Sequence, residues 1–559
     1  MRILPLLIAI MFVQACAPSG FIAVADPVAM PDRPNIILIT AEDLGPRLGF
    51  MGDPVAVTPS LDRLASQSVV FTRAFTTAGV CAPSRAALIT GVHQTTIGAH
   101  NMRTSSYGEN MDEGAPYRAV PPPDVKAFPE LLRAAGYFTI NDFKTDYQFG
   151  NAFTVWDRST KGADWNDRAP GQPFFAMINH EVTHEGRTWP PDTDPALHPV
   201  VSRRNSLNAG IDATKNFQLT DPERVRVPPY WPDTPAVRAN LARFYDNIRV
   251  MDGQVGALLD RLEAEGRFAD SIIIFTTDHG DGLPRHKRTI FDSGTHVPLL
   301  VRFPDGFGAG TQRGDLVSFI DLAPTILDWA GVTIPEFVQG RRLFDDPAPD
   351  AIYMAGDRFD EVPQRFRGVR EERWHFIRYF SDKPILPSLG YQNVNPIMRE
   401  MRRLHTEGGL SPLQASYLAD AAAREFLFDT EADPDEVRNL ADNPRFAAIK
   451  SRMSDRLEKW IEGSGDMGRI PERDLVARIW PGGQQPQTAM VEACLNSGGK
   501  VLLTSETKGA SIGYGGADGE ALLYARPIDA TSPFRAKAVR YGYKPSPVAV
   551  IDRERLSTC

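Results

Sequence analysis

The chain has 559 residues, of which 42% are hydrophobic, and this is enough for a large catalytic domain and at least one smaller unit. Its formal net charge of −9 is not the excess of basic residues that is typical of nucleic-acid-binding proteins, so we expect no nucleic-acid partner. An acidic chain that binds an anionic ligand must concentrate its positive charge in a pocket.

Residues 1–25 have the features of an export signal. A positive start at Arg2 precedes an apolar run over residues 3–13, which is shorter than the roughly 20 residues that span a bilayer. Two cleavage points stay open: one before Cys16, at a lipobox-like sequence that would leave a lipidated N-terminus, and one after Ala25. Both predict a protein that the export machinery delivers to the periplasm, or to the outer membrane or cell surface as a lipoprotein. We expect membrane contact only through that lipid anchor.

Two apolar runs, over residues 35–40 and 271–275, are typical of parallel strands buried on both faces. Each run is followed by a pair of polar side chains: Glu42 with Asp43, and Asp278 with His279. Ligands of open α/β sheets lie at the carboxyl ends of the strands. Adjacent acids at strand ends are commonly helix caps, but two such pairs on neighbouring strands favour a metal site. Oxygen ligands favour Ca²⁺ or Mg²⁺, whereas an imidazole suits a transition metal such as Mn²⁺ better.

Helical patterns alternate with apolar strands along the first part of the chain. We predict helices over residues 58–65, 128–136 and 248–262, and a further buried strand over residues 174–179. This alternation predicts an α/β fold with a mostly parallel sheet that helices cover on both faces. We assign residues 26–345 to this catalytic domain.

After about residue 345 the pattern changes. Alternation over residues 367–378 is typical of antiparallel strands, and we assign residues 346–478 to a smaller α+β subdomain. A Pro- and Gly-rich linker then precedes short strand patterns, and we assign residues 479–559 to a small appended β-sandwich. This last unit contains Cys494 and Cys559, which could pair in an oxidising compartment or stay as two unpaired thiols.

Residues 81–85, Cys-Ala-Pro-Ser-Arg, combine a reactive side chain with a binding group for anions. We expect a helix to begin at Ser84, where free N–H groups and the helix dipole attract anions. Arg85 adds a guanidinium group that is always charged and that suits an oxyanion. Taken alone, the motif is more typical of a reduced or paired cysteine in an ordinary turn.

Together with residues 88–91 (Leu-Ile-Thr-Gly) and the segments 35–43 and 276–280, this motif resembles the signature of the type I sulfatases, in the alkaline phosphatase superfamily. The resemblance covers residues 33 to about 460 and is strongest to the heparan N-sulfatase (sulfamidase) branch and its bacterial relatives. It implies an alkaline-phosphatase-like fold and hydrolysis of a sulfate ester or sulfamate on a sulfated glycan or glycosaminoglycan saccharide. It also implies that a maturation enzyme oxidises Cys81 to formylglycine, and that a divalent metal is bound, Ca²⁺ with Mg²⁺ or Mn²⁺ as alternatives.

The resemblance also implies roles for individual residues. The implied metal ligands are Glu42, Asp43, residue 81 (Cys81), Asp278 and His279. The family usually has Asp where Glu42 stands and often Asn where His279 stands, and related phosphonate monoester hydrolases carry a similar Asp-His pair. The implied catalytic residues are Cys81, Arg85, Lys144, Asp146, His184 and Lys287, with Arg288 as the neighbour that a misalignment would exchange for Lys287.

In the implied mechanism, the hydrated formylglycine at position 81 attacks sulfur. Three cations offset the charge: Arg85, Lys144 and Lys287. His184 or Lys287 protonates the departing oxygen or nitrogen. Asp146 stands where the family has a histidine, so the base that completes sulfate release stays open, with Asp146 as one candidate.

Four further residues are weaker candidates for sugar contacts, with surface salt bridges as the alternative for each: His100, Arg103, Asp357 and Arg358. The C-terminal unit resembles the β-sandwich of chitobiase-type glycosidases, and we favour packing over carbohydrate binding as its role. Two other functions stay open. One is a phosphodiesterase or phosphonate monoester hydrolase of the same superfamily, and the other is a catalytically silent glycan-binding lipoprotein without formylglycine.

Overall fold

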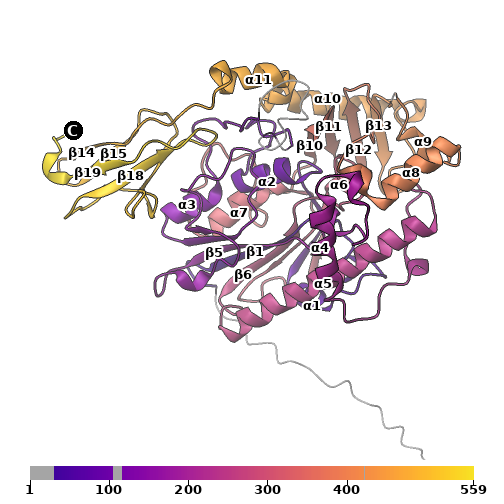
Figure 1. Ribbon diagram of the computed structural model, residues 1–559, viewed down its shortest axis with the longest axis horizontal. Coiled ribbons are helices and arrows are strands. Elements are labelled where there is room, and N and C mark those ends of the chain that lie inside the picture. The colour runs from indigo at the N-terminus through magenta and orange to yellow at the C-terminus, as the bar shows by residue number, and fades with distance from the viewer. Residues whose placement is uncertain (1–29, 103, 105–115, 421) are drawn as a thin grey trace, which may run out of the picture.

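The computed structural model describes residues 30–102, 104, 116–420 and 422–559 (Figure 1). The predicted export signal, with Cys16, lies outside the described residues, and so does Arg103. The domain boundaries after residues 345 and 478 stay predictions.

A nine-stranded sheet forms the centre of the first part of the chain. Its main strands run in the spatial order β4 (Arg158–Ser159), β3 (Phe138–Asp142), β5 (Phe174–His180), β1 (Asn35–Ala41), β6 (Ser271–Thr277), β7 (His296–Arg302), β2 (Val69–Phe75) and β8 (Thr311–Arg313), and β9 (Val317–Ser318) also pairs with β2. The pairs from β4 to β6 are all parallel, as are the pairs of β2 with β8 and β9, and only β7 runs antiparallel to its neighbours. The predicted mostly parallel sheet is confirmed.

Helices cover both faces of this sheet because successive side chains of its strands point to opposite sides. Ile37 and Ile39 of β1 belong to one apolar core with α1 (Pro59–Ala65) and α5 (Pro235–Ala264). Ile36 and Leu38 belong to a second core with α2 (Cys81–Thr90), α3 (Phe128–Ala134) and α7 (Leu322–Trp329). Figure 1 shows the two sets of helices on opposite sides of the strands. The continuous apolar run of β1 therefore fills two cores at once.

The next part of the chain forms a four-stranded antiparallel sheet with helices. Its strands are β10 (Ile352–Phe359), β11 (Val362–Arg370), β12 (Trp374–Tyr379) and β13 (Glu425–Asp429). The helices of this region are α8 (Pro396–Glu407), α9 (Pro412–Ser416), α10 (Ala447–Gly463) and α11 (Glu472–Ile479). Met453, Leu457 and Ile461 recur every four residues along α10 and pack on Val369 and Phe376 of the sheet. The predicted antiparallel strands are confirmed. Two further helices, α4 (Val201–Asp212) and α6 (Asp292–Thr295), lie earlier in the chain.

The C-terminal unit consists of two antiparallel sheets around one small apolar core. One sheet pairs β14 (Glu492–Leu495) with β15 (Val501–Thr504), and the other has the order β17 (Leu522–Leu523), β16 (Ser511–Tyr514), β18 (Phe534–Val539) and β19 (Ala549–Ile551). Cys494 and Cys559 form a disulfide. Tyr541 stacks on Phe149 with ring centroids 4.9 Å apart and donates a 2.7 Å hydrogen bond to Glu130 of α3. The unit therefore packs on the catalytic part of the chain, as we favoured.

Candidate active site

Cys81 is the first residue of α2 and is buried. The helix begins three residues earlier than the Ser84 start that we predicted, so the thiol stands on the first turn rather than before it. Pro83 does not prevent this, because the first N–H groups of a helix have no intrahelical partner and proline loses nothing there. The Cys81 Sγ atom lies 3.3 Å from His279 Nε2 and 3.7 Å from Asp43 Oδ1.

The two polar pairs meet because β1 and β6 are adjacent parallel strands that end in register, with Ala41 opposite Thr277. Directly after β1, Asp43 takes a left-handed backbone conformation (φ 50°), which aspartate tolerates better than most residues. Its backbone N–H donates a 2.9 Å hydrogen bond to Asp278 Oδ1. The strand ends therefore hold both pairs at one point of the sheet edge.

Four side chains converge there and form what we call the carboxylate–thiol cluster: Asp43, Cys81, Asp278 and His279. Their ligand atoms all lie within 4.8 Å of one another, which fits coordination of a single divalent cation. His279 Nδ1 lies 2.9 Å from the Gly280 carbonyl oxygen, and this contact turns Nε2 towards the cluster. Glu42 belongs instead to a group with Asp43 and His184. Four of the five predicted metal ligands are thus brought together, and Glu42 lies beside them in the second group, which shares Asp43 with the cluster.

The charges in the cluster show why a cation fits. Burial alone would lower the pKa of His279, but the negative charges of Asp278 and Asp43 raise it to about 10. The imidazole therefore carries a proton among the carboxylates. A divalent cation would take the place of this proton as the positive charge and leave Nε2 free as a ligand.

Three cations surround the cluster. Arg85 donates to Asp278 Oδ2 (3.0 Å) and to Asn179 Oδ1 (2.8 Å), and its buried Nη2 has no hydrogen-bond partner among the residues that the structure describes. Lys144 Nζ lies 2.9 Å from Glu42 Oε1. Lys287 Nζ contacts both oxygens of Asp43, at 2.9 and 2.7 Å. Burial would raise the pKa of Asp43, but the ammonium group of Lys287 and the protonated ring of His279 hold it well below its usual range.

Lys287, rather than its neighbour Arg288, reaches the cluster. Arg288 instead forms a paired contact with Glu185, at 2.8 and 2.9 Å, and a further one with Asp360. Glu185 also lies 3.1 Å from Lys287 and donates its backbone N–H to Asp43 Oδ2 at 2.7 Å. The choice of Lys287 over Arg288 therefore agrees with the geometry.

His184 has a neutral imidazole ring and lies beside the cluster. Burial lowers its pKa well below the usual range, and the nearby cations Lys287 and Lys144 add to this effect, which outweighs the attraction of Asp43. Its Nδ1 accepts a 3.2 Å hydrogen bond from the Gly186 N–H, so the proton of the neutral ring is on Nε2.

Asp146 takes a left-handed backbone conformation (φ 57°), and its side chain forms no hydrogen bond or ion pair with the described residues.

The weaker candidates for sugar contacts have internal partners. Asp357 lies 3.1 Å from Arg367, and Arg358 forms a paired contact with Glu472 at 2.7 and 2.8 Å. The salt-bridge alternative therefore describes both. His100 differs, because it is 2% exposed and its Nδ1 has no hydrogen-bond partner within the part of the chain that the structure describes.

Sequence reasoning missed three residues that complete the site: Asn179, Glu185 and Gly282. Asn179 accepts a hydrogen bond that orients Arg85, and Glu185 forms ion pairs with both Lys287 and Arg288. A Cβ at Gly282 would stand 2.7 Å from Asp43 Oδ2 and 2.8 Å from Glu185 Cβ. A polar residue at the end of a buried strand could have signalled Asn179, but nothing in the local sequence marks the other two.

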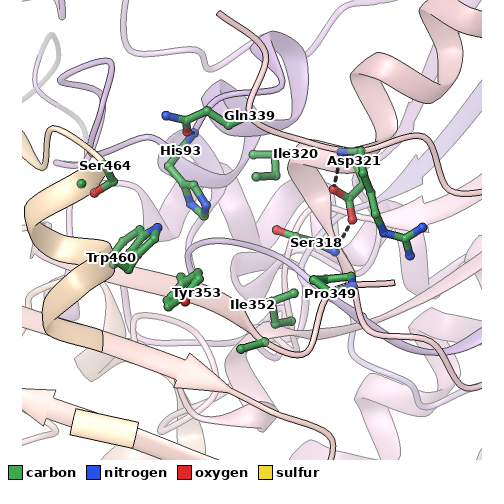
Figure 2. A pocket seen from close by; sticks show the side chains of 13 residues that line it. His93, Ser318, Ile320, Asp321, Gln339, Pro349, Ile352, Tyr353, Trp460 and Ser464 are labelled. Carbon is green, nitrogen blue, oxygen red and sulfur yellow. Dashed lines mark hydrogen bonds between the residues drawn. The ribbon is translucent and has the colours of Figure 1, made fainter. Parts of the chain in front are cut away.

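A separate cavity, of about 430 Å³, lies near the C-terminal end of α2, whereas Cys81 stands at the N-terminal end (Figure 2). His93 contacts Trp460 edge to face at 5.1 Å, and Trp460 stacks on Tyr353 at 4.9 Å. Burial lowers the pKa of His93 to about 4, so its ring is neutral at pH 7. Asp321 accepts hydrogen bonds from the backbone N–H groups of Ser318 and Arg341, as Figure 2 shows. We assign this cavity no part in the reaction.

The fold and the site together define a hydrolase of the alkaline-phosphatase-like fold. The sulfatase family model matches residues 34–332, and a model for the C-terminal part of N-sulphoglucosamine sulphohydrolase matches residues 284–387. An ulvan-active sulfatase of Formosa agariphila is 37% identical over 509 residues, which cover 88% of this chain and 85% of that protein. Human N-sulphoglucosamine sulphohydrolase is 28% identical over 463 residues, covering 76% of this chain and 89% of that protein.

A protein solved in complex with its substrate D-glucosamine-2-N,6-O-disulfate has a TM-score of 0.54 at 17% identity, over 79% of this chain and 99% of that chain. This likeness bears out the fold. The chain belongs to the sulfatase family and is a sulfuric ester hydrolase. Among the described helices, none combines the length and apolarity needed to cross a membrane.

Proposed function

We propose that the chain releases sulfate from a sulfated saccharide through formylglycine made from Cys81, with one divalent cation held by the carboxylate–thiol cluster. The observation that carries this proposal is the position of Cys81. Its Sγ atom lies on the first turn of a buried helix, 3.3 Å from His279 and 3.7 Å from Asp43. When bound, the cation and the formylglycine supply an activated hydroxyl nucleophile.

The side chains around Cys81 have separate tasks in this proposal. Arg85 has a buried Nη2 without a hydrogen-bond partner among the described residues, and we assign it to the sulfate oxygens. Lys144, which is 14% exposed and close to Glu42, offsets the charge that develops on those oxygens. Neutral His184 donates a hydrogen bond from its Nε2–H to the departing oxygen or nitrogen and so stabilises the charge that develops there. Lys287 holds Asp43 in place, because two buried carboxylates already surround its ammonium group.

The saccharide assignment rests on the relatives. One is named for activity on ulvan, another for N-sulphoglucosamine, and a similar fold binds D-glucosamine-2-N,6-O-disulfate. The match to the C-terminal model of N-sulphoglucosamine sulphohydrolase supports sulfamate as well as sulfate esters. We propose Ca²⁺ as the cation, with Mg²⁺ or Mn²⁺ as alternatives, because Asp43 and Asp278 supply two carboxylate oxygens and a formylglycine at residue 81 would replace the sulfur with a third oxygen.

Export and maturation are part of the same proposal. We propose that the chain is exported to the periplasm or the cell surface, and that a formylglycine-generating enzyme converts Cys81. The disulfide between Cys494 and Cys559 supports an oxidising compartment.

The test is a panel of defined saccharides incubated with protein whose residue-81 peptide has been analysed by mass spectrometry. The panel holds N-sulfated and O-sulfated glucosamine, ulvan oligosaccharides and a phosphate diester. We expect sulfate release from at least one saccharide and only in proportion to the converted fraction. Faster cleavage of the phosphate diester would instead favour a phosphodiesterase, and unconverted Cys81 in protein from its own host would favour a silent binding protein.

A further inference from the structure

An open groove of about 680 Å³ lies beside the site, between β11, the loop after β12 and the turn that precedes α11. We call it the anion groove. Its volume falls in the range of roughly 300–1,000 Å³ that is typical of ligand pockets. The exposed ring of Phe380 lines it, and His100 also lines it with a buried Nδ1 that has no hydrogen-bond partner among the described residues.

The anion groove has an unbalanced charge. Five cationic side chains and three carboxylates line it. Two of the carboxylates are engaged internally, Asp357 with Arg367 and Glu472 with Arg358. Only Asp382 is left to face the remaining four cations: Arg365, Lys383, Arg424 and Arg469.

Within the described part of the chain, none of these four cations forms an ion pair. Arg424 donates to the Ser381 carbonyl oxygen at 2.8 Å, and Arg365 stacks on Phe380 with its guanidinium 4.1 Å from the ring centre. Lys383, Arg424 and Arg469 are exposed, and Arg365 is half-buried. In a chain of net charge −9, unpaired cations that gather in one groove form a local site for anions.

The groove adjoins the reacting thiol. Phe359, next to Arg358, belongs to the same buried cluster as Cys81 and Met102. The Met102 N–H donates a 2.8 Å hydrogen bond to the Arg358 carbonyl oxygen. A short piece of chain therefore separates the groove from the carboxylate–thiol cluster.

We propose that the anion groove binds the sulfate or carboxylate groups of the sugar units that flank the sulfated unit, so that the preferred substrate is a polyanionic oligosaccharide. This inference rests on the proposed function. A monosaccharide sulfate would fill only the site beside Cys81, whereas a longer saccharide would also meet Arg424 and Arg469. Guanidinium groups suit this task because they pair with sulfate and carboxylate through two parallel hydrogen bonds.

The test compares Arg424→Gln/Arg469→Gln with a matched control, Lys508→Gln/Arg526→Gln. Both double variants remove two exposed cations without a described ion pair, but the control pair lies in the C-terminal unit. Binding of a heparin tetrasaccharide is measured by titration calorimetry, and hydrolysis of 4-nitrophenyl sulfate is measured in parallel. Thermal unfolding checks that both variants fold.

We expect the groove variant to bind the tetrasaccharide about tenfold more weakly or worse, because each charged hydrogen bond contributes measurably to affinity. The control variant should bind as the unmodified protein does, and all three should hydrolyse 4-nitrophenyl sulfate equally. Equal binding by all three proteins, an equal loss in the control, or no binding by the unmodified protein would overturn the inference. If none released sulfate, the proposed function would fail, while the binding data would still decide the groove.

Discussion

The carboxylate–thiol cluster and the anion groove both gather cationic side chains, but those side chains have different partners. Around the cluster, Lys144 and Lys287 each face a buried carboxylate, and Arg85 contacts Asp278. In the groove, Arg424 and Arg469 are exposed and have no carboxylate partner among the described residues. Buried, paired charges hold a fixed geometry, whereas exposed and unpaired charges adapt to ligands of varied shape. In our account, the buried carboxylate–thiol cluster carries out one fixed reaction, and the exposed anion groove, a few residues away, binds saccharides of varied shape.

The largest effect should follow from removing charge in the cluster. In Asp43→Asn, the amide keeps the shape but leaves Lys287 with Glu185 alone and replaces a charged ligand of the proposed cation with a neutral, weaker one. We expect sulfate release to fall at least about 100-fold and bound metal to fall from one ion per chain to almost none. Rates and metal content measured on the same preparation check this. Asp382→Asn, which removes an exposed groove carboxylate, should keep both, and retention of both by Asp43→Asn would contradict the assignment.

The geometry of the cluster can be disturbed without changing any charge. Gly282→Ala places a methyl group 2.7 Å from Asp43 Oδ2, so the carboxylate or the loop must move. We expect about 100-fold slower release, since displacements near 1 Å at a reacting centre have effects of that size.

The matched control for that variant is Gly253→Ala. Gly253 lies in α5 with no atom within 4 Å of the added Cβ. This control should keep full activity and gain about 0.5–1 kcal/mol of stability in thermal unfolding. Equal activity of the two alanine variants would show that Asp43 tolerates displacement.

A rise in salt concentration should weaken binding in the anion groove more than it slows hydrolysis at the carboxylate–thiol cluster. Raising the ionic strength shortens the Debye length from about 10 Å at 0.1 M to about 3 Å at 1 M. Binding of a heparin tetrasaccharide should weaken about tenfold over this range, because the groove cations are exposed. Hydrolysis of 4-nitrophenyl sulfate should change far less, since the cluster is buried. An equal salt dependence of both measurements would remove the distinction.

The smallest effect is a gain. In Glu472→Gln, the paired contact with Arg358 is lost, and a fifth cation of the groove becomes available to a ligand. We expect affinity for the tetrasaccharide to rise a few-fold, with some loss of stability. Unchanged or weaker binding would indicate that Arg358 does not face the bound saccharide.

Much of the fold could be predicted because its signals are local. The apolar run of β1 is buried on both faces, and the helical spacing of Ile248, Met251 and Val255 lies within α5. The predicted start of α2 at Ser84 is wrong by three residues, because Pro83 stands in the first turn of the helix and not before it. The ends of helices are the part of a helix that a sequence pattern defines least well.

The site was predictable only where a family motif marks its residues. Cys81, Asp43, Asp278 and His279 meet as the motif implies. Glu185 and Gly282 depend on how separate loops pack, which neither composition nor periodicity encodes. The free cations of the groove come from four separate segments, so only the assembled structure brings them together.

The most direct test of the central claim is the rate of sulfate release from 4-nitrophenyl sulfate by the unmodified protein and by Cys81→Ala, each with its residue-81 peptide analysed. We predict that release follows the converted fraction of the first protein and is absent from the second. Equal release by the two proteins would contradict the assignment of Cys81 as the source of the nucleophile.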